Sequence, residues 1–177
     1  GPHVFHTNSA RIFDYLSQFT AWRPYAHRVQ GQVDGRRVPL PFNLDSIETL
    51  FAAATAERMT QALVQRFDFG ARPSIHDLRR AGDDPDLRRL GDYVFDKVFA
   101  GYTAKQWGLP VEALDASVTA RVPIAVSRDD RYFVDRHQAM PRDGYGALFH
   151  RMLDHPNITV SLNTPMDQVG AGSWDRM

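Results

Sequence analysis

The 177-residue chain contains no cysteine. This absence excludes disulfide bonds, thiol nucleophiles and thiolate metal sites together. Neither sign of charge is in excess, because 21 lysines and arginines balance 21 aspartates and glutamates. Such a balance gives no general attraction to nucleic acid or to an anionic membrane surface. We therefore expect neither of them as a partner.

Long apolar runs are also missing. No stretch approaches the roughly 20 apolar residues that a membrane-spanning helix needs, and no secretory signal opens the sequence. The hydrophobic share of 43% and the charged share of 24% are those of a globular protein. These values predict a folded, soluble protein. The absence of cysteine is compatible with a reducing compartment, and a cytoplasmic localisation is expected.

Familiar catalytic and metal-binding motifs are absent. The sequence has no Walker A loop, no HExxH, no G-x-S-x-G elbow and no EF-hand loop. Its two G-x-G fragments, at 144–146 and 170–172, lack the third glycine and the preceding strand of a dinucleotide fingerprint. His3 and His6 have no third ligand nearby. We therefore expect no metal site.

The two ends of the sequence do not look like natural ends. The first residue is not methionine, and Gly1-Pro2 is compatible with a native sequence or with a remnant of tag removal. Residues 170–177 end without a helix cap or a completed strand. These features predict an internal piece of a longer protein.

Turn and cap signals predict the elements of the first half. A helix should begin at Asn8 or Ser9, and an Asp34-Gly35 turn should close a hairpin over 25–40. Helical patterns then run from Asp45 to Tyr102. They are expected to begin at a capping box of Asp45 and Glu48, at Ser74 with Asp77, and at Pro85.

Fewer elements are expected in the second half. A short helix is predicted over 111–120, and another over 147–153 after a loop at 141–146. Alternating apolar residues at 158–162 predict a strand. The two arginine doublets at 79–80 and 88–89 are interpreted as a solvated helix face.

The residues between Gly101 and Gly108 combine aromatic faces with polar groups. Tyr102 and Trp107 enclose a hydroxyl, a lysine and an amide, and arginines follow at 121 and 131. Aromatic rings stack on bases or sugars, and arginine binds a diphosphate with two parallel hydrogen bonds. This pattern indicates a nucleotide or nucleotide-sugar site, with packing in the core as the alternative for the same rings.

Five segments together resemble bacterial UDP-galactopyranose mutases in order and approximate spacing. They are GPHVFHT (1–7), LPFNL (40–44), GYTAKQWG (101–108), DRYF (130–133) and MPRDGY (140–145). The resemblance implies a flavoenzyme that interconverts UDP-galactopyranose and UDP-galactofuranose by covalent catalysis from N5 of reduced FAD. It also implies a homodimeric parent and no side-chain nucleophile, because the protein chiefly binds, orients and excludes water.

The resemblance also implies site residues. Tyr102 would stack on the uracil with Phe99 beside it, and Arg121 and Tyr132 would bind the diphosphate. Thr103, Trp107, Asn43 and Phe133 would lie near the nucleotide and sugar, and Pro2 and His3 against the flavin. One departure is Val98, where the family often has an aromatic residue.

The implied fold is α+β and helix-rich, taken from a larger FAD-binding α/β flavoprotein. Residues 1–20 would end a flavin-domain segment, 44–120 would form a helical substrate domain with a lid segment, and 21–43 with 121–177 would form parts of an antiparallel sheet domain. The glycine-rich FAD loop would precede residue 1, so the chain alone should neither hold FAD nor turn over. Two alternatives stay open: another flavoprotein of amine-oxidase-like fold, or a non-catalytic helical interaction module.

Overall fold

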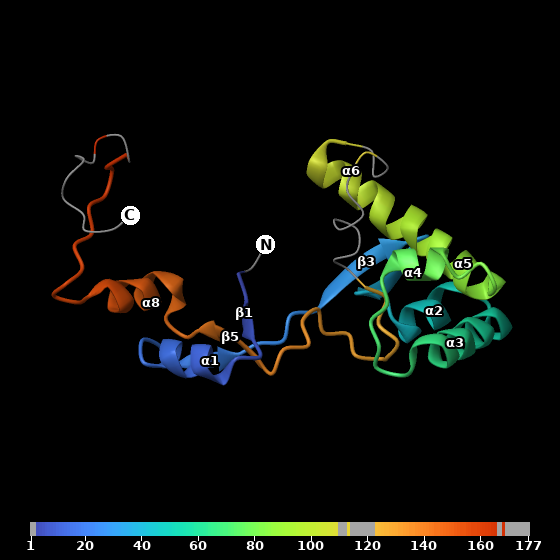
Figure 1. Cartoon of the computed structure of the whole chain (residues 1–177), viewed down its shortest axis with the longest axis horizontal. Coiled ribbons are helices and arrows are strands. Elements are labelled where there is room, and N and C mark those ends of the chain that lie inside the picture. The colour runs from blue at the N-terminus through green and yellow to red at the C-terminus, as the bar shows by residue number, and fades with distance from the viewer. Residues whose placement is uncertain (1–2, 110–112, 114–122, 166–167, 169–177) are drawn as a thin grey trace. The chain divides into compact units, whose positions relative to one another are not determined.

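The computed structural model describes residues 3–109, 113, 123–165 and 168. The chain divides into two compact units, one made of residues 1–25 with 135–177 and the other of residues 26–134. Helices and two small antiparallel sheets make up these units (Figure 1). The prediction of an α+β chain is confirmed.

The first unit is built on a three-stranded antiparallel sheet. Its order is β1-β5-β2, with Phe5 opposite Ala139 and Trp22 opposite Pro141. Its elements are β1 (Phe5–Thr7), α1 (Ala10–Ser17), β2 (Trp22–Pro24), β5 (His137–Pro141) and α8 (Gly144–Leu153). The central strand, β5, therefore joins two strands that lie more than a hundred residues earlier in the sequence.

Aromatic rings pack helix α1 against this sheet. The Phe5 and Trp22 rings are stacked with centroids 4.7 Å apart, and Phe13 of α1 stacks on His137 at 4.2 Å. The Trp22 indole nitrogen also donates a hydrogen bond of 2.8 Å to Ser17 Oγ. Stacked rings of this kind stabilise a small unit beyond the area that they bury.

The second unit joins a β-hairpin to a helical bundle. The hairpin turn has positive φ at both Asp34 (45°) and Gly35 (79°), as a type I′ turn requires. The elements are β3 (Val29–Val33), β4 (Arg36–Leu40), α2 (Leu44–Leu50), α3 (Ala53–Phe67), α4 (Ile75–Arg79), α5 (Pro85–Val94), the π-helix η1 (Phe95–Ala100) and α6 (Gly101–Trp107).

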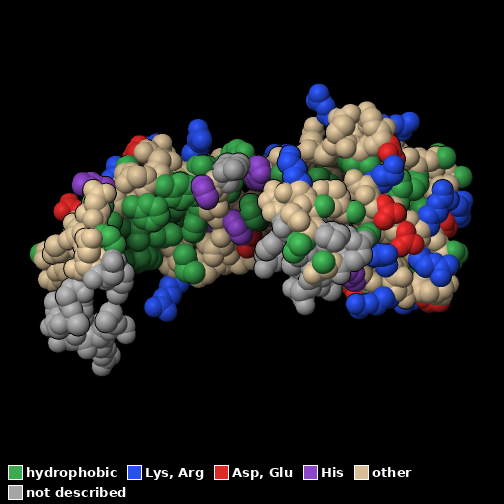
Figure 2. All heavy atoms as spheres, turned by 90° about the horizontal axis from the view of Figure 1, so that it is seen from above, with side chains coloured by type: hydrophobic (Ala, Val, Ile, Leu, Met, Phe, Trp, Pro, Cys, Tyr) green, Lys and Arg blue, Asp and Glu red, His purple; other side chains and the backbone are tan. Residues whose placement is uncertain are grey.

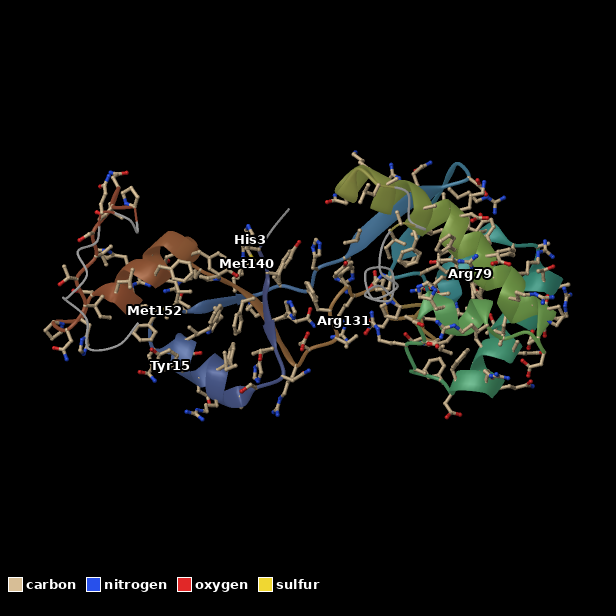
Figure 3. The ribbon with its side chains drawn as sticks, turned by 45° about the horizontal axis from the view of Figure 1, so that its top comes forward. His3, Tyr15, Arg79, Arg131, Met140 and Met152 are labelled. Atoms are coloured by element: carbon tan, nitrogen blue, oxygen red, sulfur yellow. The ribbon has the colours of Figure 1, made fainter. Side chains whose placement is uncertain are left out.

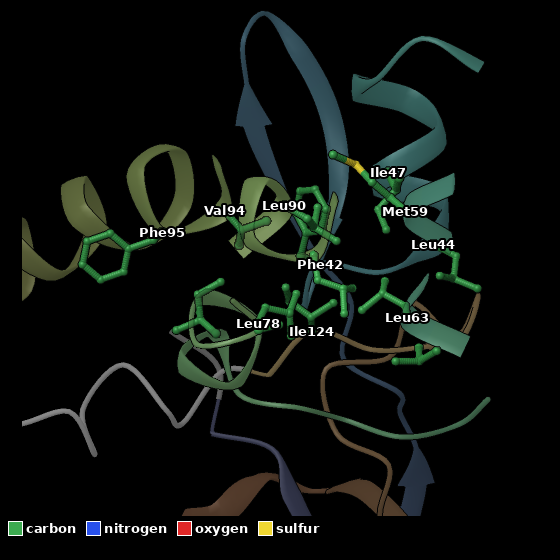
Figure 4. Packing of buried hydrophobic residues seen from close by; sticks show 14 of the residues in the cluster. Phe42, Leu44, Ile47, Met59, Leu63, Leu78, Leu90, Val94, Phe95 and Ile124 are labelled. Atoms are coloured by element: carbon green, nitrogen blue, oxygen red, sulfur yellow. The ribbon is translucent and has the colours of Figure 1, made fainter. Parts of the chain in front are cut away.

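One apolar core holds the helices of the second unit together (Figure 4). Ile47 of α2, Leu63 of α3 and Leu90 of α5 are fully buried in it. Ile124 and Val126 enter the same core from the segment after the helices. Burial of one such side chain contributes about 1.5–3 kcal/mol.

Most of the predicted helix starts are confirmed. Ser9 caps α1, Asp84 caps α5 with Pro85 at its first position, and Ser74 with Asp77 forms a capping box at α4. The predicted capping box of Asp45 and Glu48 is wrong. The box is formed by Asn43 and Ser46, because Asn43 has the extended backbone that a cap needs while Asp45 already lies in the first helical turn.

Other predictions for the second half need correction. Residues 158–162 alternate in sequence but form no strand, because no described segment pairs with them. Helix α8 begins at Gly144, inside the predicted loop, and β5 was not predicted. The helix predicted over 111–120 lies outside the described residues except for residue 113. Among the described residues, no helix has the length and apolar character needed to cross a membrane.

Candidate functional site

Four of the proposed substrate-binding residues lie on the last part of a long helix: Phe99, Tyr102, Thr103 and Trp107. Helix α5 continues through η1 into α6 without an intervening loop. Phe99 lies in η1 and is only 6% exposed, so its ring belongs to the core cluster. Gly108 ends the helix with a left-handed φ of 66°, a conformation that favours glycine. The predicted helix end at this glycine is confirmed.

The structure places only part of the candidate set. Tyr102, Thr103 and Trp107 belong to the backbone of α6. Arg121 and Pro2 lie outside the described residues. The direction of the Tyr102 and Trp107 rings therefore stays a prediction.

The segment that contains Ala125 lies beside the residue that begins α2, and its neighbours Ile124 and Val126 belong to the core. Ala125 forms a parallel bridge with Asn43, and its backbone nitrogen donates to the Phe42 carbonyl at 2.8 Å. On its other side, the backbone nitrogen of Val126 donates to the Ala71 carbonyl at 2.9 Å. Hydrogen bonds on both sides fix this segment, which leads toward Tyr132.

Asn43 is fully buried at the start of α2. Its Oδ1 accepts a hydrogen bond of 3.0 Å from the backbone nitrogen of Ser46. Its Nδ2 is buried without a hydrogen-bond partner among the described residues. A buried donor without a partner costs free energy. The Asn43 side chain therefore caps α2 through its oxygen and has an amide nitrogen that is free to donate a hydrogen bond.

Tyr132 and Phe133 follow the segment that borders Asn43. The two rings meet edge to face with centroids 5.0 Å apart, and the Tyr132 ring also contacts the His27 ring at 5.9 Å. The backbone nitrogen of Tyr132 donates to the His27 carbonyl at 2.8 Å. Next to them, Arg28 pairs with Asp130 at 2.7 Å. The structure therefore brings Tyr132 and Phe133 together and ties them to residues 27–28.

Arg128 ties the same segment to the first turn of α2. Its guanidinium contacts both Asp45 and Glu48, with one N–O distance of 3.0 Å to Glu48. The hydrogen bond from Arg128 lowers the pKa of Glu48, and the two acidic partners raise the pKa of Arg128. Both groups are exposed, so salt screens this contact. On the face seen in Figure 2, charges of both signs mix over this unit.

His3 lies in the first unit, just before β1 (Figure 3). It lines an open hollow with Val4, Phe5, His6, Tyr145 and Phe149. The Tyr145 and Phe149 rings are stacked at 6.2 Å, and burial raises the pKa of Tyr145. His6 contacts Asp135 at 2.9 Å. Within the described ranges, no group of three potential metal ligands occurs.

Two sets of side-chain contacts between segments far apart in the sequence were not predicted. Asp34 at the hairpin turn receives hydrogen bonds from Tyr93 Oη at 2.8 Å and Lys97 Nζ at 2.7 Å. Arg128 contacts the first turn of α2. An acidic turn residue was visible in the sequence, but its partners lie about sixty residues away, so no local pattern could identify them.

The chain is similar to sequences of one family of sugar-nucleotide mutases. A sequence model of the UDP-galactopyranose mutase family matches residues 97–176. A probable UDP-galactopyranose mutase from Klebsiella pneumoniae is 33% identical over 92% of this chain and 41% of its own length. This chain is a relative of the UDP-galactopyranose mutases. The resemblance read from the five sequence segments is confirmed.

Two further relatives have similar identity to this chain and differ in the sugar nucleotide that they are named for. The UDP-galactopyranose mutase of Mycoplasma pneumoniae is 31% identical over 98% of this chain and 44% of its own length. A dTDP-fucopyranose mutase from Escherichia coli is 30% identical over 95% of this chain and 44% of its own length. All three are named mutases of sugar nucleotides. The chain spans about two fifths of the length of these curated relatives.

Proposed function

We propose that the protein to which this chain belongs interconverts UDP-galactopyranose and UDP-galactofuranose, and that this chain supplies the nucleotide-binding wall. The observation that carries the proposal is the family match over residues 97–176. That range contains every proposed substrate-binding residue except Asn43. It also contains most of η1, from residue 97 on, all of α6 and the segment leading to Tyr132 and Phe133.

The proposed roles follow from the chemistry of each side chain. Tyr102 stacks on the uracil because every base offers a π face to an aromatic ring. Phe99, which is buried, would support this wall from the core side. Arg121 binds the diphosphate in a forked arrangement, and Tyr132 donates its hydroxyl to the same phosphates. Thr103, Trp107, Asn43 and Phe133 complete the surface near the nucleotide and sugar.

The described residues fit one wall of a flavin site. The hollow beside His3 is lined by the rings of Phe5, Tyr145 and Phe149, which suit a flat aromatic ligand. His3 would contact the flavin there, and the resemblance assigns Pro2, which lies outside the described residues, to the same group. When bound, reduced FAD supplies the nucleophile for the anomeric carbon of the sugar. The residues of this chain orient the nucleotide and exclude water. No glycine-rich dinucleotide loop occurs in the 177 residues, so this chain contributes no cradle for the FAD diphosphate.

The wider assignments belong to the same proposal. The whole protein is a cytoplasmic FAD-binding flavoprotein, homodimeric, that supplies galactofuranose for cell wall biosynthesis. Residues 44–120 act as its helical substrate domain with a lid segment, residues 1–20 end a flavin-domain segment, and residues 21–43 with 121–177 form parts of its sheet domain. The similarity to named mutases favours this assignment over another amine-oxidase-like flavoprotein or a non-catalytic helical module.

A second candidate substrate is a dTDP-6-deoxyhexose. The Escherichia coli relative is named a dTDP-fucopyranose mutase, and its identity to this chain is close to that of the UDP-galactopyranose mutases. Thymine differs from uracil by one methyl group. A hydrophobic pocket discriminates such a group by about 10- to 200-fold at most. The dTDP sugar also lacks the ribose 2′-hydroxyl and the hexose 6-hydroxyl, so contacts to these two groups discriminate between the substrates together with contacts to the base.

The test is an assay of the whole protein with reduced flavin. UDP-galactofuranose and dTDP-fucofuranose are supplied separately, and the pyranose products are separated by chromatography. We expect turnover of UDP-galactofuranose with the higher kcat/KM. A higher kcat/KM for the dTDP sugar would identify the second candidate, and no turnover of either sugar would contradict the proposal.

A further inference from the structure

A π-helical segment, η1, immediately precedes α6, on which Tyr102, Thr103 and Trp107 lie. Helix α5 gives way to η1 at Phe95, and η1 gives way to α6 at Gly101. A π turn closes i→i+5 hydrogen bonds, one residue more than an α turn. Because each residue advances an α-helix by about 100°, the extra residue rotates everything after it by about that angle. The direction that α6 presents therefore depends on η1 remaining π-helical.

One carboxylate bridges the junction between α5 and η1. Asp34 Oδ2 accepts a hydrogen bond of 2.8 Å from Tyr93 Oη, and Asp34 Oδ1 accepts one of 2.7 Å from Lys97 Nζ. Tyr93 lies in the last turn of α5, whereas Lys97 lies in η1. The hydrogen bonds from Lys97 and Tyr93 also lower the pKa of Asp34. The hairpin turn thus binds one residue of α5 and one residue of η1 through the same side chain.

The turn itself does not need a carboxylate. Positive φ at Asp34 and Gly35 is accommodated equally by Asn-Gly or Gly-Gly in a type I′ turn. The hairpin turn therefore does not require the Asp34 carboxylate. Both oxygens of this carboxylate accept hydrogen bonds from the helix, one from Tyr93 and one from Lys97. Glycine at this position removes the bridge, and asparagine removes its charge and one of its two acceptor oxygens, while the turn is kept.

We propose that Asp34 is a positioning residue for the nucleotide-binding wall. By joining Tyr93 to Lys97 it holds η1 in its π-helical form, and this form sets the rotation of α6, on which Tyr102, Thr103 and Trp107 lie. Asp34 itself touches no substrate in this account. The inference rests on the proposed function for its kinetic consequence, but its structural part does not.

The test compares Asp34→Gly, Asp34→Asn and Lys97→Met in the whole protein. The matched control is Asp83→Asn. It removes the exposed ion pair between Asp83 and Arg66, whose N–O distance is 2.8 Å and which involves no residue of η1. Steady-state kinetics give KM and kcat for UDP-galactofuranose, and hydrogen–deuterium exchange is measured on peptides covering 95–107. Exchange over 53–67, in α3, reports general loosening of the fold.

The expected result is local. Asp34→Gly should raise KM about three- to fivefold, as expected for losing an exposed charge pair, with kcat little changed and faster exchange confined to 95–107. Asp34→Asn and Lys97→Met should give smaller changes of the same kind, and Asp83→Asn none. Unchanged KM and exchange, or equally faster exchange over 53–67, would overturn the inference. If the wild-type protein lacks mutase turnover, the proposed function fails, and the exchange data still decide whether Asp34 holds η1.

Discussion

Asn43 and Ser46 cap each other at the start of α2. The Ser46 backbone nitrogen donates to Asn43 Oδ1 at 3.0 Å, and the Asn43 backbone nitrogen donates to Ser46 Oγ at 3.3 Å. Both residues are fully buried, and Asn43 also bridges to Ala125. A residue that the resemblance assigns to the substrate therefore also begins a helix and borders the segment that leads to Tyr132.

Replacing Asn43 should weaken the fold as well as the site. Asn43→Ala removes the side-chain cap, so we expect the free energy of unfolding to fall by about 1–2 kcal/mol. Asn43→Ser keeps an oxygen that can cap, and its loss should be smaller. Urea denaturation of the chain measures both variants. Equal losses for alanine and serine would show that capping is not the reason for the effect.

Two glycines of the long helix should respond oppositely to alanine. A Cβ at Gly91 would lie 3.0 Å from the Arg79 backbone nitrogen and 3.1 Å from Leu78 Cβ, so α4 and α5 would have to separate. We expect Gly91→Ala to destabilise the chain by about 1–3 kcal/mol through overpacking. A Cβ at Gly101 meets no atom within 4 Å, so Gly101→Ala should stabilise by up to about 1 kcal/mol. Thermal unfolding of both variants checks the signs, and a stabilised Gly91→Ala variant would contradict the close packing.

Tyr93 should lose its proton at a higher pH than an unperturbed tyrosine, and this difference should make the stability of the fold depend on pH in the alkaline range. Burial, followed by the hydrogen bond to Asp34, raises the pKa of Tyr93 from 10.0 to about 12. The folded state thus holds this proton more tightly than the unfolded chain. The resulting stability is complete below pH 10 and is lost as the pH rises toward 12.

Ultraviolet absorbance of tyrosinate measures this ionisation directly. Tyr93→Phe should remove the transition near pH 12, and Asp34→Asn should move it to lower pH because the negative hydrogen-bond acceptor is gone. If the late transition persists in Tyr93→Phe, the assignment to Tyr93 is wrong.

The isolated chain should not retain FAD. Its 177 residues include no glycine-rich loop for the diphosphate, and a helix N-terminus preceded by such a loop is what holds that group in dinucleotide sites. Purification after incubation with FAD, followed by absorbance spectroscopy, should show no bound flavin. Stoichiometric yellow colour after gel filtration would contradict this expectation. The whole protein, treated identically, is the control.

Local signals predicted the local parts of the fold. Asp34-Gly35 predicted the hairpin, and Ser74 with Asp77 predicted the start of α4, because turns and caps depend on a few neighbouring residues. The start of α2 was misassigned because Asn43 and Asp45 are both capable caps and only the backbone conformation distinguishes them. Strand β5 was missed because its partners, such as Phe5, lie far away in sequence.

The candidate site was predicted less completely than the fold. Resemblance named Asn43, Phe99 and Tyr132, but their burial and contacts depend on packing across the second unit. The contacts of Asp34 and Arg128 with distant helices carry no motif. Such contacts arise only when remote segments meet, so no pattern along the chain could predict them.

The most direct test of the central claim is the UDP affinity of the whole protein with and without the Tyr102 ring. Base stacking on an aromatic ring contributes about 1–3 kcal/mol, so calorimetry should show UDP binding weakened by about fivefold or more in Tyr102→Ala. The control is Tyr15→Ala, which removes an exposed tyrosine from α1 and should leave the affinity unchanged. An unchanged affinity in Tyr102→Ala, in a protein that binds UDP, would contradict the assignment of this helix as the uridine-binding wall.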